Sequence, residues 1–140
     1  MAAIDLNTVR ETIEERLITE LNDAPPIDVV LNNMPFDASA KDTFVQCLTS
    51  FGANEYLTQG DTSSATNNVV GLVILNVFTE EGIGAGSNYI ICKRLRDLYN
   101  RITVSNVIFD PPIGPEIFTS SLEGKFQTQI RITFNIYEDL

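Results

Sequence analysis

The amino-acid sequence predicts an α+β fold, with a mostly antiparallel or mixed sheet of four to five strands and two helices packed on one of its faces. This prediction rests on two segments with helical periodicity, several short apolar segments of strand character, and a C-terminal segment whose side chains alternate. In residues 125–137, one face would carry Phe126, Thr128, Ile130, Ile132, Phe134 and Ile136, and the other Lys125, Gln127, Gln129, Arg131, Thr133 and Asn135. Such a strand belongs to a sheet that is buried on one face only, which argues against enzymes built on doubly covered parallel sheets. The predicted order is α-β-β-β-α-β-β, in a single domain of residues 1–140.

The first predicted helix has one apolar stripe. Its apolar residues recur at steps of three and four, the spacing of one helix face: Leu6, Val9, Ile13, Leu17 and Leu21. Asp5 is placed to act as the N-cap. Residues 22–26 end the helix, because their prolines cannot donate a hydrogen bond to a continuing helix.

Three strands are predicted to follow the first helix, at residues 27–31, 43–59 and 69–79. The second mixes apolar and polar residues and is expected to bend or bulge near Gly52. Polar residues 60–68 would close a hairpin onto the third strand. Because that third strand is the most apolar of the chain, we expect it at the centre of the sheet.

The second predicted helix runs from an N-cap at Ser87 to about Ile102, with a buried stripe of Ile91, Leu95, Leu98 and Ile102. Residues 103–109 are predicted to form a strand. Residues 110–124 contain three prolines and are predicted to form a long loop, which in a compact domain is usually functional. The final strand is expected at an edge of the sheet, where unpaired backbone groups are a template for another chain.

The composition limits the classes of function. The chain has 140 residues and a net charge of −10, which opposes the phosphate backbone, so tight nucleic-acid binding is not expected. No signal peptide is recognisable, and the longest apolar run, residues 69–78, is about half of what a membrane span needs. Cys47 and Cys92 are expected to be buried free thiols. These features predict a protein made in the cytoplasm without membrane association.

Catalytic and cofactor motifs are weak. The chain has no histidine, which excludes Ser/His/Asp and Cys/His nucleophile systems and imidazole metal sites. Gly82, Gly84 and Gly86 lie between a strand and a helix, but a dinucleotide loop needs a further glycine where this chain has Ser87. The aspartates match no calcium-loop spacing. We therefore expect no cofactor, no metal and no catalytic residue.

Paired carboxylates are the remaining candidates for acid–base chemistry. They occur at Glu14 and Glu15 and at Glu80 and Glu81. Adjacent carboxylates on a helix face or at a strand end are far more often solvated. A small acidic hydrolase or nucleotide-binding enzyme that uses Glu80, Glu81 and the glycine segment is one alternative to a structural protein.

Basic residues are concentrated on the second predicted helix. Lys93, Arg94, Arg96 and Arg101 are four of the nine basic residues of the chain. One interpretation is a solvated face, with cations favoured near the C-terminal end of the helix. The other is a charge-complementary contact with an acidic surface of a partner or of the next copy. A contact between two different patches is head-to-tail, and such contacts can close into rings.

In the order of its elements and in specific residues, nearly the whole chain resembles the tail terminator family of long-tailed bacteriophages. The resemblance rests on the amphipathic first helix, the turn with Asn33, Pro35 and Phe36, the strand at residues 71–78 with Glu81 and Gly82 behind it, the helix at 87–102, and the closing Gly124-Lys-Phe followed by the alternating strand that ends in Tyr137.

The resemblance implies a structural virion protein that is not an enzyme. It implies a hexameric ring that caps the head-proximal end of the tail tube, stops tube polymerisation and presents a docking surface to head-completion (neck) proteins, while DNA passes through the lumen without tight binding. The expected location is the tail neck of the virion, after assembly in the host cytoplasm. Another head–tail connector protein or a tail tube subunit is a further alternative. The candidate interface residues are Phe36, Lys93, Arg94, Arg96, Arg101, Pro112, Glu116 and Phe118.

Overall fold

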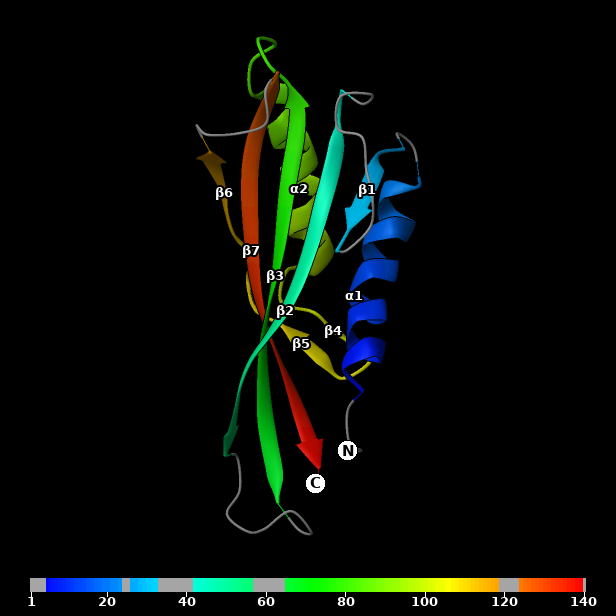
Figure 1. Ribbon diagram of the computed structural model, residues 1–140, viewed down its shortest axis with the longest axis vertical. Coiled ribbons are helices and arrows are strands. Elements are labelled where there is room, and N and C mark those ends of the chain that lie inside the picture. Colours follow the sequence, from blue (N-terminus) through cyan, green and yellow to red (C-terminus); the bar gives the residue numbers. More distant parts are fainter. Residues whose placement is uncertain (1–4, 24–25, 33–41, 57–64, 119–123, 140) are drawn as a thin grey trace.

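The computed structural model describes residues 5–23, 26–32, 42–56, 65–118 and 124–139. Within these ranges it consists of two helices and a seven-stranded sheet (Figure 1). The elements, in chain order, are α1 (Leu6–Leu21), β1 (Asp28–Leu31), β2 (Phe44–Tyr56), β3 (Thr66–Glu80), α2 (Gly86–Tyr99), β4 (Thr103–Val104), β5 (Val107–Phe109), β6 (Ile113–Phe118) and β7 (Lys125–Asp139). The predicted α+β class is confirmed, but the sheet has more strands than the four to five expected.

The strands lie in the order β1-β2-β3-β7-β5-β4, and β6 also pairs with β7. β1 is parallel to β2 and the other pairs are antiparallel, so the sheet is mixed. β3 lies between β2 and β7, in the interior position that its apolar sequence predicts. The register of β2 and β3 shifts between Phe51 and Asn54, which confirms the predicted irregularity at Gly52.

The prediction that the final strand lies at an edge is wrong. β7 pairs with β3 over its whole length and with β5 and β6 on its other side. β6 lies inside residues 110–124, for which the sequence predicts a loop. Prolines disfavour strands because they cannot donate to a ladder, but an edge strand tolerates them at a bulge. Pro115 lies where the β6–β7 register shifts between Ile113 and Glu116.

Residues 103–109 form a hairpin and not the single strand predicted. The turn residues Ser105 and Asn106 have φ angles of 47° and 70°, both left-handed. They connect β4 to β5, whose register pairs Val104 with Val107. A two-residue turn with positive φ at both positions matches the twist of antiparallel strands, so this turn folds the short segment back on itself.

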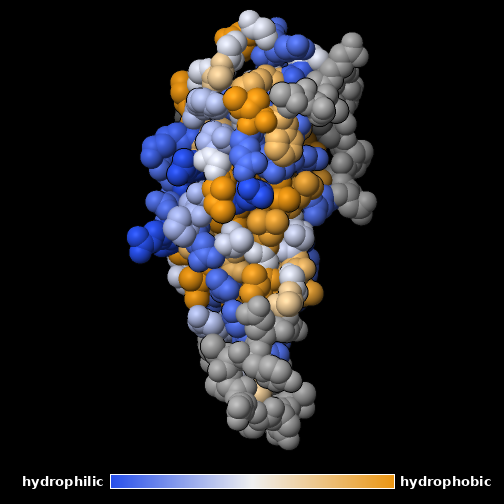
Figure 2. All heavy atoms as spheres, turned by 90° about the vertical axis from the view of Figure 1, so that its left-hand side faces the viewer, coloured by the Kyte–Doolittle hydropathy of each residue, from blue (hydrophilic) through white to orange (hydrophobic). Residues whose placement is uncertain are grey.

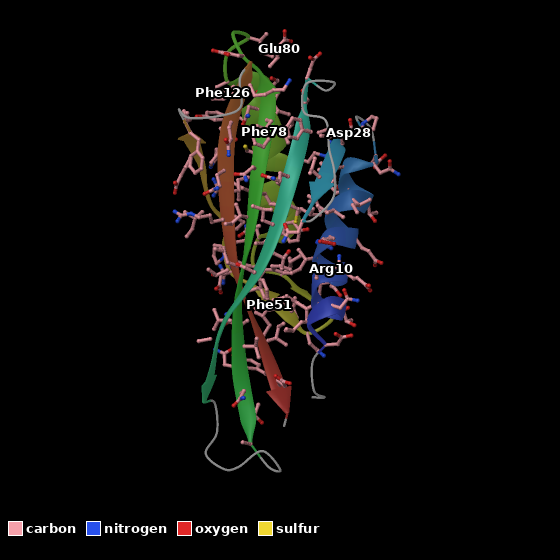
Figure 3. All side chains as sticks on the ribbon, in the orientation of Figure 1. Arg10, Asp28, Phe51, Phe78, Glu80 and Phe126 are labelled. Carbon is pink, nitrogen blue, oxygen red and sulfur yellow. The ribbon has the colours of Figure 1, made fainter. Side chains whose placement is uncertain are left out.

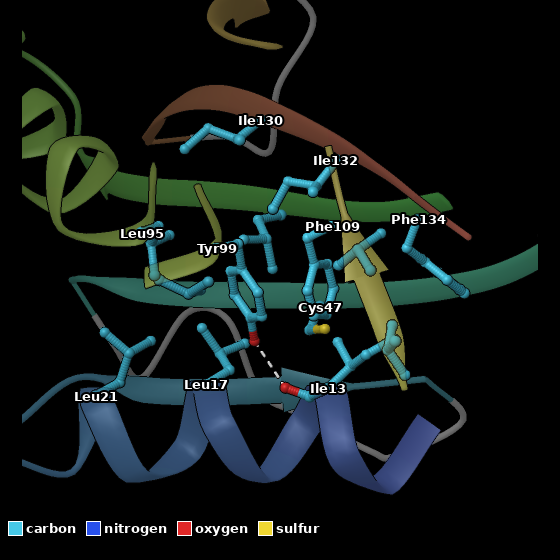
Figure 4. Close-up of a cluster of buried hydrophobic side chains, with 14 of the residues drawn as sticks. Ile13, Leu17, Leu21, Cys47, Leu95, Tyr99, Phe109, Ile130, Ile132 and Phe134 are labelled. Carbon is cyan, nitrogen blue, oxygen red and sulfur yellow. Dashed lines mark hydrogen bonds between the residues drawn. The ribbon is translucent and has the colours of Figure 1, made fainter. Parts of the chain in front are cut away.

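α1 packs on the sheet through the predicted stripe (Figure 4). The backbone N–H of Asn7 donates to the Asp5 side chain, which confirms Asp5 as the N-cap. Leu6 is 51% exposed, because the first turn of α1 extends past the core. The other four stripe residues are buried: Val9, Ile13, Leu17 and Leu21.

α2 begins and ends earlier than predicted. Its N-cap is Ala85, without a side-chain capping bond, and Ser87 lies inside the helix, so the predicted Ser87 cap is wrong. Leu98 and Ile102 are only partly buried. The buried stripe lies closer to the N-terminus than predicted and consists of Asn88, Ile91, Cys92, Leu95 and Tyr99.

Both helices contribute to one core on one face of the sheet. Tyr99 of α2 donates a hydrogen bond of 2.7 Å from its hydroxyl to the carbonyl oxygen of Ile13 in α1 (Figure 4). The alternation predicted for β7 is confirmed from Thr128 onward, because Thr128, Ile130, Ile132, Phe134 and Ile136 are all buried. At the start of the strand it is not, because Phe126 is half-buried and Gln127 of the opposite face is buried. Neither α1 nor α2, the helices of the described chain, combines the length and apolarity that a membrane span requires.

Candidate interaction surfaces

A groove of about 330 Å³ lies between α2 and β6. Tyr89, Lys93 and Arg96 line it from α2, because steps of four and three place them on one helix face. Pro115 lines it from β6, and Cys92 forms part of its floor. The antiparallel pairing of β6 with β7 brings this edge strand beside α2. Hereafter we call these five residues the α2–β6 groove.

Large apolar side chains are exposed beside the α2–β6 groove. Ile117 of β6 is 53% exposed, and Tyr89 of α2 is 42% exposed. Ile117 is the register partner of Thr128, whose hydroxyl contacts Cys92, so Ile117 stands on the helix side of the sheet. Figure 2 shows apolar side chains standing among charged ones over the side of the molecule that carries β6. Exposed apolar groups at a sheet edge are typical of contact surfaces.

The basic residues predicted on the second helix have different roles. Arg94 Nε donates to Glu20 Oε1 at 2.9 Å and its guanidinium also contacts the Glu20 carbonyl oxygen, so it joins α2 to α1 within one subunit. Lys93 forms an exposed pair with Asp97 at 2.8 Å. Arg96 is exposed in the α2–β6 groove, and no ion pair to it is formed within the described part of the chain.

The remaining candidate residues are scattered. Arg101 is exposed just after α2, with a φ of 55°. Pro112 is buried, and Phe118 is half-buried at the end of β6. Glu116 pairs with Arg131 of β7 at 2.5 Å. Phe36 lies outside the described residues. Of the eight candidates, Lys93 and Arg96 are the two that line the α2–β6 groove.

Asn88 is a buried polar residue that the sequence analysis missed. Its amide nitrogen donates to the Val77 carbonyl oxygen at 3.1 Å, and its amide oxygen accepts from the Thr128 hydroxyl at 2.5 Å. The Cys92 thiol contacts the same amide oxygen at 3.3 Å. This network fixes α2 on β3 and β7 beneath the groove. Its burial could have been predicted from the sequence, because Asn88 lies three residues before Ile91 and therefore on the same, buried face of the helix.

Both cysteines are buried and free, as predicted. Burial raises the pKa of the Cys47 thiol to about 12. Burial also raises the pKa of Cys92, although its contact with Thr128 acts in the opposite direction. A raised pKa keeps a thiol protonated at neutral pH, and the thiolate is the nucleophilic form. Neither cysteine is therefore set up as a nucleophile.

The paired carboxylates do not converge on a common site. Glu14 is buried on α1 and bound by Arg10, contrary to the solvated carboxylate expected, whereas Glu15 is exposed. Glu80 and Glu81 are both exposed, and Figure 3 shows Glu80 at the upper end of the molecule and Arg10 near its middle. Among the described residues, no group of three or more acidic or thiol side chains is arranged to hold a metal ion.

The face of the sheet opposite the helices carries a row of amides. Asn76 donates to Gln46 Oε1 at 2.9 Å and accepts from Gln127 and Gln129 at 3.1 and 3.0 Å. Gln46 and Gln129 are its register partners on the two neighbouring strands. Phe44 and Phe78 stack beside this row, with ring centroids 4.6 Å apart.

Along β3, the same face becomes apolar. Val70, Leu72 and Ile74 are half-buried, and they stand on the same face as Asn76 because side chains alternate along a strand. The described helices pack on the other face. A continuous apolar row that neither α1 nor α2 covers is a second candidate contact surface.

Comparison with known proteins identifies a fold but no family. No family model matches the sequence, and no curated protein matches it. Matches in fold include 23 chains of solved structures. One of them, a protein whose name states no function, superimposes with a TM-score of 0.69 over 96% of both chains, at 15% sequence identity. At that identity the likeness shows the fold alone.

Proposed function

We propose that the protein is a structural subunit of a bacteriophage tail, which forms a ring at the head-proximal end of the tail tube and terminates tube polymerisation. The observation that carries the proposal is the exposure of large apolar side chains where an edge strand meets its neighbouring helix, at Ile117 of β6 and Tyr89 of α2. Surfaces of this kind are typical of subunits that assemble. The resemblance of the sequence to tail terminators supplies the identity of the assembly.

The proposed mechanism is physical and needs no reactive group. One face of the ring offers the tube end the contact that a further tube subunit would offer. The opposite face lacks the surface on which the tube propagates and instead docks a head-completion protein. Growth of the tube therefore stops when the ring binds.

The open face of the sheet supports a role in stacking. The half-buried row of Val70, Leu72 and Ile74 lies beside the satisfied amides of Asn76 and its partners. Apolar groups favour removal from water, whereas paired amides can enter an interface without leaving an unsatisfied polar group. This combination suits a surface that is covered by another subunit after assembly.

The net charge of −10 is compatible with passage of DNA through such a ring. Acidic side chains repel the phosphates of DNA and do not form the contacts by which basic side chains retain nucleic acid. An acidic subunit would let the genome pass without holding it.

Tube growth in the presence of the purified protein tests the proposal. Polymerising tube protein from the same phage is mixed with increasing amounts of this chain, and tube lengths are measured by electron microscopy. We expect shorter tubes that carry a density at one end. Tubes of unchanged length would contradict the proposal, and long fibres formed by this chain alone would identify it as a tube subunit.

The competing hypothesis is a small acidic enzyme that uses Glu80, Glu81 and the glycine segment. A ligand that binds only the native state raises the melting temperature. Thermal-shift measurements with nucleotides and divalent cations should therefore show no increase if the protein is a tail subunit. An increase that disappears in a Glu80→Gln/Glu81→Gln variant would favour the enzyme.

A further inference from the structure

The two flanks of the subunit carry patches of opposite charge. In Figure 1, β6 lies at the left-hand edge of the sheet and α1 lies along the right-hand side. The α2–β6 groove on the first flank contains Lys93 and Arg96. The outward side of α1 on the second flank carries exposed Glu11 and Glu15. The basic pair on one copy can therefore complement the acidic pair on a second copy.

The exposed side of α1 is a defined surface. Glu11, Glu15 and Ile18 follow one another at steps of four and three, so they stand on one helix face, roughly opposite the buried stripe. Ile18 is 40% exposed. Glu11 has a loose contact of 3.7 Å with Arg10, and Glu15 forms no ion pair within the described ranges. We call these three residues the acidic face of α1.

The α2–β6 groove offers matching groups. Lys93 and Arg96 are three residues apart on α2, and carboxylates four residues apart on α1 have nearly the same separation, because both spacings place side chains on adjacent turns. When Arg96 lies opposite Glu15, Lys93, one turn earlier on α2, can lie opposite Glu11, one turn earlier on α1. Arg96 forms no ion pair within the described part of the subunit, so its charge is available to a partner.

We infer that the α2–β6 groove of one copy binds the acidic face of α1 of the next copy. The two patches lie at different places on the subunit, so the contact is head-to-tail and can close into a ring. This inference deepens the proposed function, because it names the contact that would build the terminator ring. Arg96 and Glu15 form the central pair of this contact.

A charge exchange between two variants tests the inference. Arg96→Glu makes the groove acidic, and Glu15→Lys makes the face of α1 basic. Each variant alone would place like charges opposite each other, and we expect its self-association constant, measured by sedimentation velocity, to fall at least about tenfold. In an equal mixture each altered patch can meet a complementary one, so we expect association to return to about the wild-type value. The double variant Arg96→Glu/Glu15→Lys should also assemble alone.

Arg101→Glu is the matched control. It reverses the same charge just beyond the end of α2, outside the groove, and should leave association nearly unchanged. Circular dichroism melting of all variants shows whether each remains folded. Raising the salt concentration should weaken wild-type association, because exposed charge pairs are screened.

The inference is wrong if Arg96→Glu associates like the wild type, if the mixture associates no better than the separate variants, or if the wild type stays monomeric. Tube capping is measured separately on the same proteins. Capping that survives Arg96→Glu with an intact ring would overturn this contact and leave the proposed function standing. A ring that depends on the Arg96 and Glu15 pair but caps no tube would support this contact and contradict the proposed function.

Discussion

The ring of Phe134 on β7 lies directly against the backbone of Gly71, its register partner on β3. A Cβ atom at position 71 would lie 2.1 Å from Cζ of Phe134, which is far inside van der Waals contact. Phe51 of β2, the register partner of Gly71 on the other side, packs edge-on against the same ring, with centroids 5.9 Å apart. The absence of a side chain at Gly71 therefore makes room for an aromatic ring in the centre of the sheet.

Gly71→Ala should destabilise the protein strongly. The added methyl group would force Phe134 out of its position, and overpacking of a dense core costs about 3 kcal/mol of unfolding free energy or more when the neighbour cannot move freely. Urea unfolding followed by circular dichroism measures the loss. A second variant, Gly71→Ala/Phe134→Leu, should recover part of it, because the smaller side chain leaves space for the methyl group.

Gly86→Ala is the control for this substitution. Apart from its chain neighbours and the backbone of α2, no described atom lies within 4 Å of a Cβ placed at Gly86, at the start of α2. Alanine is a better helix former than glycine, so we expect the free energy of unfolding to increase by up to about 1 kcal/mol. Equal effects of the two alanine substitutions would contradict the role assigned to the contact between Gly71 and Phe134.

The sequence predicts the parts of this fold that depend on periodicity. The stripe of α1 and the alternation of β7 follow from steps of three to four and of two, and the structure has both. It does not predict β6, because Gly114 and Pro115 read as a loop in isolation. Residues 113–118 form a strand because they pair with the neighbouring β7, and their bulge is tolerated because β6 lies at the edge of the sheet.

The candidate surface was predictable in its charge but not in its geometry. The concentration of basic residues on α2 is visible in the sequence, but Arg94 and Arg96 have different roles. Arg94 faces Glu20, 74 residues away in sequence, and Arg96 faces the groove. This difference depends on how α2 lies against α1, which is set by tertiary packing and not by local spacing.

Arg94→Gln should therefore lower the stability of the isolated subunit. It removes the charged contacts with Glu20 that hold α1 and α2 together in a partly buried place. We expect a loss of about 1 kcal/mol in unfolding free energy, since partly exposed ion pairs contribute modestly. Arg96→Gln, whose parent side chain is exposed, should unfold at nearly the wild-type urea concentration. A larger loss for Arg96→Gln would mean that Arg96 has a structural contact within the subunit.

Asn88→Ala should destabilise the packing of α2. It leaves the Thr128 hydroxyl without its acceptor, removes the donor to the Val77 carbonyl oxygen, and opens a small cavity in a fully buried place. Buried polar groups that lose their partners cost about 1–3 kcal/mol each, so we expect a loss in unfolding free energy of a few kcal/mol. Asn100→Ala, at an exposed position just after α2, is the control and should change stability little. A loss as small as that of the control would show that the Asn88 network does not hold α2.

The stability of the protein should fall in alkaline solution, in part through Tyr99. Burial raises the pKa of the Tyr99 hydroxyl above its usual value of 10.0, although the nearby Arg16 acts in the opposite direction, and burial raises that of Cys47 from 9.0 to about 12. Both groups stay protonated in the folded chain at a pH where the unfolded chain has released their protons. Their contribution is therefore complete below about pH 9 and is lost as the pH rises, by about 1.4 kcal/mol per pH unit for each group. Tyr99→Phe removes one of these groups and also the 2.7 Å bond to Ile13, so it should lower stability at pH 7 by about 1 kcal/mol but show a shallower decline between pH 10 and 11. Urea unfolding at pH 7, 9, 10 and 11 measures both effects. If the stability of Tyr99→Phe declined as steeply with pH as that of the wild type, the pKa of Tyr99 would not be raised by folding.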